Sequence, residues 1–317
     1  MRISTITCQN TDNHGARLQA YALARHLRDH GNEVEIIDYR PPYMDPTYRV
    51  FYWPGRNIKE WGRFFYYLPN RVLMRRRHGS FVSFANQYLP LSRRVYHSVD
   101  DLRSNPPEAD LYLAGSDQIW NTSFKNGTDP AYYLDFGSAT IRRESYAASF
   151  ATEDIQPSAI PFLKANLGRF DKITVREKSG LRILEELGFQ GEQVDDPVFL
   201  LSAEEWAALC DGTGKDKRYV LVYDFFSDSG LRKKAKEVAR QKKLPIYAIC
   251  PRYQWYASKN FMTAGPRTFL SLIKNASCLI TNSFHGIAFS MIFDTPFVFV
   301  ERPDGLNERM RDLLSHK

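Results

Sequence analysis

The chain has 317 residues, of which 43% are hydrophobic and 25% are charged, and its formal net charge is +7. This composition is typical of a globular protein with a substantial core, and it excludes a low-complexity or disordered chain. The four cysteines are scattered without a CxxC pair, which argues against a zinc site and a disulfide scaffold. We see neither a secretory signal nor a long apolar run, so we expect a cytoplasmic protein.

The positive charge is concentrated in residues 46–97. This stretch holds ten arginine and lysine residues against one acid, Glu60, so its charge is +9 and the remainder of the chain carries about −2. It also contains the aromatic sequences FYW and WGRFFYYLP. One interpretation is a helical excursion with solvated arginines. The other is a surface that meets an anionic partner: a phosphate-bearing substrate, a lipid-linked acceptor or the inner membrane face.

Nucleic acid is not expected as the partner of this basic stretch, because no recognisable nucleic-acid-binding module accompanies the charge.

The N-terminal half alternates between strands and helices. RISTITC predicts a strand, Ala16 to His30 predicts an amphipathic helix that ends at Gly31, and EVEIIDY predicts the next strand. This βαβ opening implies parallel pairing with a right-handed crossover. ADLYLAG and KITVRE predict further strands, and the helix SGLRILEELG follows the second of them.

A second alternating series follows the polar segment CDGTGKDKR at 210–218. We therefore predict an α/β protein of two Rossmann-like doubly wound domains facing a cleft, residues 1–205 with the excursion at about 46–97, and residues 206–317. In such sheets, ligands bind beyond the carboxyl ends of the strands. Candidate functional residues are therefore sought in the loops that follow strands.

Two strand ends in the N-terminal half offer candidates for ligand binding and proton transfer. After the first strand, Asp12 and Asn13 precede Gly15, which lets the backbone approach a ligand, although a plain helix N-cap explains Asp12 or Asn13 equally well. Asp117 follows a Gly-Ser turn, where it is either a general acid or base or a turn residue.

A third strand end carries Arg176. A guanidinium at this position could bind a carboxylate or phosphate in bidentate fashion, or it could form an ion pair with a neighbouring acid.

The fourth strand end is TNSFHG, residues 281–286. Asn282 or Ser283 is a suitable N-cap, so His285 falls in the first turn of the following helix. A helix N-terminus presents free N–H groups and positive partial charge, which favour an anion. We predict that His285 contacts an anion.

Taken together, these segments resemble the polysaccharide pyruvyl transferase family. The resemblance runs in order through NTDNHGARLQAYALARHL, EVEIIDYRP, LYLAGSDQIWN, YYLDFG, SYAASF, TVREKSGLRILEELG, VDDPVFLL and LIKNASCLITNSFHGIAFSMIF. It implies a fold like that of the GT-B glycosyltransferases. It also implies transfer of a pyruvyl group from phosphoenolpyruvate to two hydroxyls of a saccharide or lipid-linked saccharide, with formation of a cyclic ketal and release of phosphate. No cofactor or metal is expected.

The resemblance also implies roles for individual residues. Arg176 and His285 match the family residues that contact the donor, and Asn282 stands beside them, whereas Asp117 matches an acidic residue less securely. Better-studied members carry arginine where this chain has Ser283, so Arg252 or another basic residue would have to substitute. The loop of Asp12, Asn13 and Gly15 is assigned to the acceptor side.

The chain ends at LNERMRDLLSHK, earlier than we expect for the family, which leaves open whether a closing C-terminal helix returns to the first domain. Two rival functions also stay open. One is a GT-B glycosyltransferase that uses a nucleotide sugar, and the other is a glycan-assembly module without catalytic activity.

Overall fold

The computed structural model describes residues 1–44, 58–225, 227–302 and 307–316, with only the backbone described in 58–70 and at residue 316. The chain divides into two compact units, and each is described by itself. The first unit comprises Met1–Met44, Asn86–Leu201 and Arg302–Lys317, and the second comprises Asp45–Ala85 and Ser202–Glu301.

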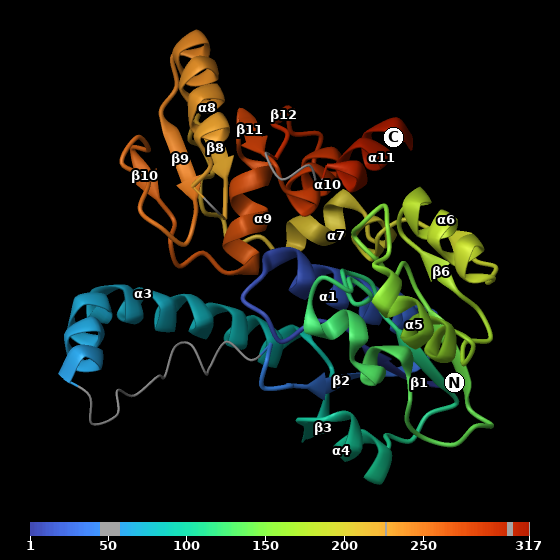
Figure 1. Ribbon diagram of the computed structural model, residues 1–317. Helices are drawn as coiled ribbons and strands as arrows, with labels where there is room; N and C mark the ends of the chain where they lie inside the picture. The colour runs from blue at the N-terminus through green and yellow to red at the C-terminus, as the bar shows by residue number, and fades with distance from the viewer. Residues whose placement is uncertain (45–57, 226, 303–306, 317) are drawn as a thin grey trace. The chain divides into compact units, whose positions relative to one another are not determined.

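The first unit contains a five-stranded parallel sheet in the order β3-β2-β1-β4-β5, of which Figure 1 labels β1, β2 and β3. Its strands are β1 (Arg2–Ile6), β2 (Glu33–Tyr39), β3 (Leu91–Tyr96), β4 (Leu111–Ala114) and β5 (Arg142–Ser145). A two-stranded sheet, β6 (Thr174–Val175) and β7 (Glu192–Gln193), continues beyond β5 through isolated parallel bridges. The strand order reverses between β1 and β4, which makes their carboxyl ends the switch point of this sheet.

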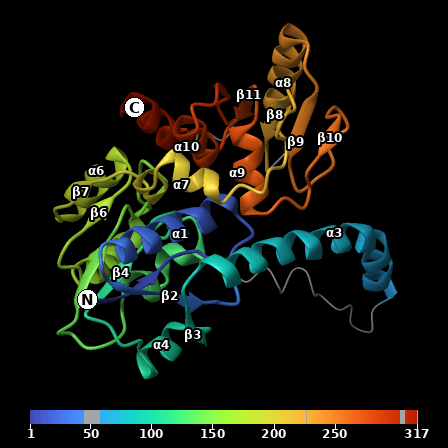
Figure 2. The ribbon, with the colours of Figure 1, turned by 180° about the vertical axis from the view of Figure 1, so that it is seen from behind.

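Helices and 3-10 turns connect these strands, and α1 packs against β2 (Figure 2). The helices are α1 (His14–Asp29), α4 (Val99–Ser104), α5 (Ile160–Leu167), α6 (Lys178–Leu187) and α11 (Glu308–His316). The 3-10 helices are η1 (Lys125–Thr128), η2 (Pro130–Tyr133), η3 (Pro157–Ala159) and η4 (Pro197–Leu200).

The second unit repeats this topology in the order β10-β9-β8-β11-β12, again with parallel pairing. The strands are β8 (Val220–Tyr223), β9 (Ile246–Ile249), β10 (Lys259–Asn260), β11 (Cys278–Thr281) and β12 (Phe297–Phe299), and the helices are α7 (Ala203–Ala208), α8 (Ser229–Lys242), α9 (Pro266–Lys274) and α10 (Phe284–Ile292). All residues of β8 and β11 are buried, as is typical of parallel strands covered on both faces. The switch point lies between β8 and β11.

Two segments belong to the other unit than the predicted domains, residues 1–205 and 206–317, would place them in. The basic stretch includes one long helix, α3 (Ile58–Tyr88), whose residues up to Ala85 group with the second unit. Residues 302–317 group with the first unit, so the C-terminal helix α11 does return to it. Asp312 of α11 accepts hydrogen bonds from the Lys178 backbone N–H at 3.2 Å and from Gln193 Nε2 at 2.8 Å.

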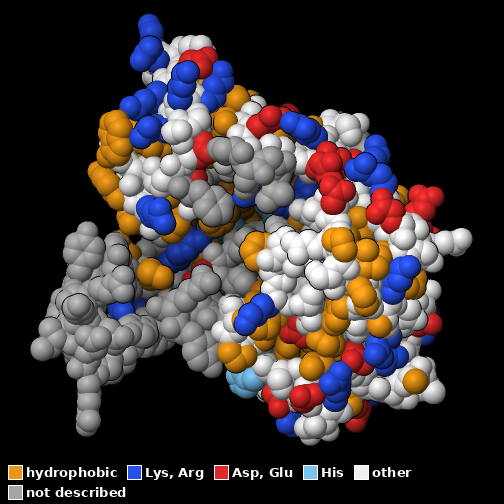
Figure 3. Space-filling model, in the orientation of Figure 1, with side chains coloured by type: hydrophobic (Ala, Val, Ile, Leu, Met, Phe, Trp, Pro, Cys, Tyr) orange, Lys and Arg blue, Asp and Glu red, His pale blue; other side chains and the backbone are white. Residues whose placement is uncertain are grey.

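Positive charge is also not confined to residues 46–97, because α8 is itself strongly basic. Figure 3 shows lysine and arginine side chains gathered over this helix. Six of its fourteen residues are basic and one is acidic: Arg232, Lys233, Lys234, Lys236, Arg240 and Lys242 against Glu237.

Candidate functional site

The switch point of the second sheet places polar groups at the start of α10. Ser283 has extended backbone angles, and its Oγ accepts the N–H of Gly286 at 3.4 Å, so it is the N-cap that the sequence predicts. The Ser283 backbone N–H donates to Thr281 Oγ1 at 3.1 Å, and Thr281 Oγ1 donates to the carbonyl of Tyr223 at 3.1 Å. The last residues of β8 and β11 thereby fix the start of the helix.

His285 is the second residue of α10 and is 8% exposed. Its ring makes an edge-to-face contact with Phe284, with 5.2 Å between the ring centroids. Asn282, which is also buried, lies between the strand and the helix. The structure therefore brings Asn282, Ser283 and His285 together at a helix N-terminus, where the peptide dipoles favour an anion.

The Tyr223 hydroxyl connects this group to a basic residue that the sequence did not single out. Burial raises the pKa of Tyr223, while the positive charge of Arg77 and a hydrogen bond with Ser283 act in the opposite direction. Arg77 lies on α3, is 7% exposed and stacks over the Phe81 ring at 5.2 Å. One arginine of the basic helix is therefore buried and acts electrostatically on Tyr223, whereas its neighbours Arg75 and Arg76 are exposed.

The sequence offered little signal for Arg77, because it stands in a run of three arginines. Which of the three points inward depends on how α3 packs within the second unit. Ser80, one turn later, donates a hydrogen bond to the carbonyl of Thr263 at 3.2 Å, and this contact helps to fix the helix orientation.

Arg252 lies in the loop after β9, one strand away from the switch point, and is exposed. Asp224, directly after β8, is buried and accepts hydrogen bonds from the backbone N–H groups of Ser227 and Asp228 at 3.0 and 2.7 Å. It shapes the loop that precedes α8.

In the first unit, Arg176 is buried between two carboxylates. Its Nη1 donates to Asp196 Oδ2 at 2.6 Å and its Nε donates to Glu177 Oε1 at 3.1 Å. Ser116 Oγ donates to the same oxygen of Asp196 at 3.2 Å, and Ser149 Oγ donates to Glu177 Oε1 at 2.6 Å. Burial alone would lower the pKa of Arg176, but the two carboxylates more than offset it, so the pKa stands above its usual value. Arg176 therefore forms the ion pair that was one of its two interpretations, and this pair is buried. Contact of Arg176 with a donor substrate stays a prediction.

Asp117 follows β4 at the switch point of the first sheet and is partly exposed. Its φ angle is +76°, a left-handed conformation that is uncommon for residues other than glycine but tolerated by aspartate. The conformation is fixed by its neighbours, because the Asp117 carbonyl accepts the N–H groups of Ile119 at 2.8 Å and Ser149 at 3.1 Å. Among the described residues, the Asp117 carboxylate has no hydrogen bond or ion pair, and its charge acts on Arg176 and Arg309.

The loop after β1 contains the predicted acceptor-side residues. Asn13 is the N-cap of α1, and its Oδ1 accepts the N–H groups of Gly15 at 2.9 Å and Ala16 at 3.3 Å. The capping interpretation is therefore confirmed for Asn13. Asp12 is partly exposed and raises the pKa of Arg17, which burial has lowered to about 10.

The predicted residues thus form two sets. Asp12, Asn13, Gly15, Asp117 and Arg176 belong to the first unit, and Arg252, Asn282, Ser283 and His285 belong to the second.

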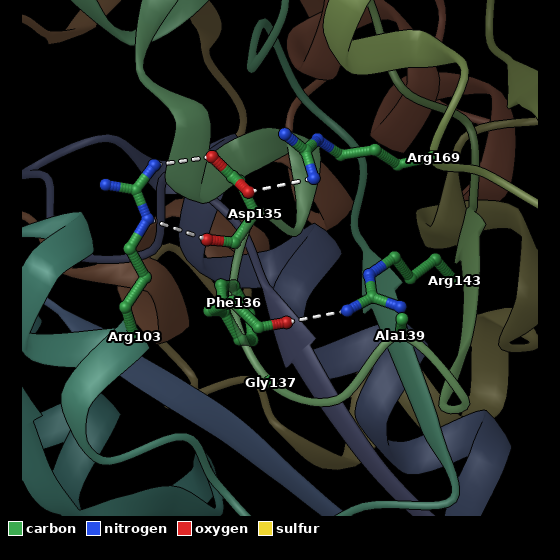
Figure 4. Close-up of a pocket in the computed structure, with 7 residues that line it drawn as sticks. All are labelled: Arg103, Asp135, Phe136, Gly137, Ala139, Arg143 and Arg169. Atoms are coloured by element: carbon green, nitrogen blue, oxygen red, sulfur yellow. Dashed lines mark hydrogen bonds and ion pairs between the residues drawn. The ribbon is translucent and has the colours of Figure 1, made fainter.

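A cavity of about 390 Å³ lies in the first unit, at the amino ends of the strands and so at the other edge of the sheet from Asp117 (Figure 4). Its arginines are engaged: Asp135 pairs with Arg103 at 2.5 Å and with Arg169 at 2.9 Å, and Arg143 donates to the carbonyl of Phe136 at 2.8 Å. Because this edge carries the amino ends of the strands and its arginines are engaged by Asp135 or by backbone carbonyls, we interpret the cavity as structural. It is lined by Arg103, Asp135, Phe136, Gly137, Ala139, Arg143 and Arg169.

Within the described ranges, no group of three or more histidine, cysteine, aspartate or glutamate side chains is placed to hold a metal ion. In the same part of the chain, no helix is both long and apolar enough to cross a membrane.

Comparison with known proteins identifies the family. Residues 13–304 match the family model described as polysaccharide pyruvyl transferase. The chain belongs to the polysaccharide pyruvyl transferase family. Its members are transferases, and the matched region contains both sets of predicted residues except Asp12. No curated protein matches the chain by sequence.

Several solved structures are similar to the chain at low sequence identity. UDP-GlcNAc 2-epimerase from Methanocaldococcus jannaschii is 12% identical, with a TM-score of 0.50 over 100% of this chain and 94% of the other. The corresponding epimerase from Rickettsia bellii is 11% identical, with a TM-score of 0.49 over 99% and 87%. Heptosyltransferase WaaC from E. coli is 11% identical, with a TM-score of 0.41 over 96% and 89%. The two Rossmann-like parallel sheets of this chain and the match to the M. jannaschii epimerase, with its TM-score of 0.50, place the α/β fold in the GT-B type.

Proposed function

We propose that this family member transfers a pyruvyl group from phosphoenolpyruvate to two hydroxyls of a saccharide or lipid-linked saccharide, forming a cyclic ketal and releasing phosphate. The family match over residues 13–304 carries the proposal. The reaction would serve the synthesis of a cell-surface polysaccharide or exopolysaccharide at the inner, cytoplasmic side of the membrane. The protein would need no metal or cofactor.

The arrangement around α10 supports an anionic donor. Phosphoenolpyruvate carries a phosphate and a carboxylate, both of which suit a helix N-terminus beside a cation. In the proposal, His285 binds the phosphate, with Asn282 and the Ser283 hydroxyl beside it. Arg77 supplies the positive charge that Ser283 cannot supply and takes the role first considered for Arg252, which is exposed.

The chemistry requires proton transfers at defined atoms. Protonation of the methylene carbon of the donor creates an electron-poor centre at the adjacent carbon, and a sugar hydroxyl attacks this centre as its proton is removed. Departure of phosphate, assisted by a proton from His285, recreates the centre, and the second hydroxyl closes the ketal. Asp117 accepts a proton from an acceptor hydroxyl, and Arg176 holds donor oxygen atoms or the loop that contacts them. Asp12, Asn13 and Gly15 line the acceptor side.

The test combines titration calorimetry with phosphoenolpyruvate and an assay for phosphate release on saccharide acceptors. We expect saturable binding by the wild type, with turnover lowered about 10²- to 10⁴-fold in His285→Ala because general acid–base help of that size is lost. Arg77→Gln should weaken donor binding, whereas Arg76→Gln, which changes an exposed neighbour, should not.

Other outcomes would identify the rival functions. Binding of a nucleotide sugar instead of phosphoenolpyruvate would point to a glycosyltransferase. Binding of neither ligand by folded protein would point to a glycan-assembly module without activity.

A further inference from the structure

The C-terminal helix α11 places the guanidinium of Arg309 beside Gln118, in the loop that follows β4 of the first sheet. With the Gln118 amide oriented so that its oxygen faces Arg309, that oxygen accepts hydrogen bonds from Nη1 at 3.0 Å and Nη2 at 3.1 Å. Gln118 directly follows Asp117, so the guanidinium lies beside the carboxyl end of β4. Arg309 also lies beyond the family match, which ends at residue 304.

The position of Arg309 is fixed by contacts of its own helix. Asp312, one turn later, is held by Lys178 and Gln193, and Glu308 forms an ion pair with Arg182 at 3.9 Å. Met310 is 1% exposed, so the helix also buries apolar surface. The placement of Arg309 is therefore a consequence of helix docking rather than of a salt bridge of its own.

The electrostatic environment of Arg309 is unfavourable without an anion. Among the described residues, no carboxylate oxygen lies within 4.0 Å of its guanidinium, whereas Arg176 has two such partners. Burial lowers the pKa of Arg309 to about 10, and the positive charge of Arg176 acts in the same direction, whereas the charges of Glu177 and Asp117 act in the opposite direction without restoring the usual value. Arg309 also occupies the first turn of α11, where the helix dipole adds further positive potential.

We infer that Arg309 binds an anionic group of the substrate, a phosphate or a carboxylate, in the first unit beside Asp117. The inference rests on the proposed function for the identity of the substrate, but not for the existence of the site. Arg309 is half-buried, and among the described residues it has no carboxylate partner. Such an arginine is suited to these groups because a guanidinium can donate two hydrogen bonds to one anion. Neutral Gln118 would hold the fork in place without competing for its charge.

The experiment compares Arg309→Gln and Arg309→Lys with Arg311→Gln, a matched control at an exposed position of the same helix. Affinities for inorganic phosphate and for pyruvate are measured by calorimetry, which separates the phosphate and carboxylate possibilities. We expect Arg309→Gln to weaken binding of one of them about 10- to 100-fold, the loss typical of a charge-assisted hydrogen-bond pair. The anion affinity of Arg309→Lys should lie between those of Arg309→Gln and the wild type. The affinity of Arg311→Gln should stay within about twofold of wild type.

Thermal unfolding without ligand separates ligand binding from a structural role. If Arg309 is held for a ligand, Arg309→Gln should unfold at the same or a higher temperature, because repulsion from Arg176 and burial of a charge are both relieved. A lower unfolding temperature together with unchanged anion affinity would overturn the inference, as would wild-type protein that binds neither anion.

Phosphate binding that depends on Arg309 without turnover of phosphoenolpyruvate would retain the site and reject the proposed function. Turnover of phosphoenolpyruvate that does not depend on Arg309 would retain the proposed function and reject the site.

Discussion

Arg176 and Asp196 form a buried ion pair, with 2.6 Å between Nη1 and Oδ2, although they are twenty residues apart in the chain. Both side chains are at most 2% exposed. Asp196 also accepts the N–H of Val198 at 3.0 Å through its other oxygen, so it caps η4 while it holds Arg176. The pair thereby joins the end of β6 to the segment that follows β7.

Arg176→Met should destabilise the first unit by about 3–5 kcal/mol, because it leaves the carboxylates of Asp196 and Glu177 buried without their cation. The measurement is chemical denaturation. Arg182→Met is the control, since the ion pair of Arg182 with Glu308 is 3.9 Å long, Arg182 itself is exposed, and the change should be about 1 kcal/mol or less. A loss in Arg176→Met no larger than that control would contradict the structural importance of the pair.

Substitution of Asp117 should lower activity without lowering stability. Asp117→Asn keeps the size and tolerates the left-handed backbone, so folding should be unchanged, while turnover should fall about 10²- to 10⁴-fold through loss of the base. Asp117→Gly should lose activity as well, yet keep its stability or gain up to about 1 kcal/mol, because glycine adopts a φ of +76° without strain. Kinetics and denaturation are measured on both variants. Normal turnover in Asp117→Asn would remove Asp117 from the mechanism.

Gly286 permits close packing of α10 on the second sheet. A Cβ atom at this position would lie 2.9 Å from Thr281 Oγ1 and 3.2 Å from Tyr223 Cδ1. Gly286→Ala should therefore destabilise the second unit by about 1–3 kcal/mol. Gly79→Ala, in the interior of α3 with no atom within 4 Å, should instead stabilise the protein by about 0.5–1 kcal/mol. Equal effects of the two substitutions would refute the packing argument.

The stability of the first unit should fall at alkaline pH. Tyr39 and Tyr43 both donate to Asp129 Oδ2, at 2.7 and 2.5 Å, and burial together with the Asp129 charge raises the pKa of both hydroxyls. In the unfolded chain a tyrosine loses its proton near pH 10. Above that pH the unfolded state binds fewer protons than the folded state, so stability declines by up to about 1.4 kcal/mol per pH unit for each tyrosine.

The double variant Tyr39→Phe/Tyr43→Phe should make this decline of stability with pH less steep, by up to the contribution of two titrating tyrosines. The measurement is the free energy of unfolding between about pH 9 and pH 11. Tyr253→Phe, at an exposed position, should leave it unchanged. An unaltered slope in the double variant would show that the two tyrosines titrate alike in the folded and unfolded chain.

Local features of this protein follow from the sequence alone. Asn13 and Ser283 cap their helices as predicted because a cap depends on a side chain and an N–H group only two or three residues away. The alternation of buried strands with amphipathic helices determines the α/β class for the same reason, since hydrophobic periodicity is a local property. The strand from Glu33 to Tyr39 has the bounds that its sequence predicts.

Only the tertiary structure decides which charges meet. The sequence places Arg176 at a strand end, but its partner Asp196 arrives through the packing of η4 against α1. Arg77 is indistinguishable from its two neighbours until α3 packs, and Arg309 reaches Gln118 only because α11 returns to the first unit. These contacts join residues far apart in the chain, and their energies depend on burial and distance, which no local pattern of residues specifies.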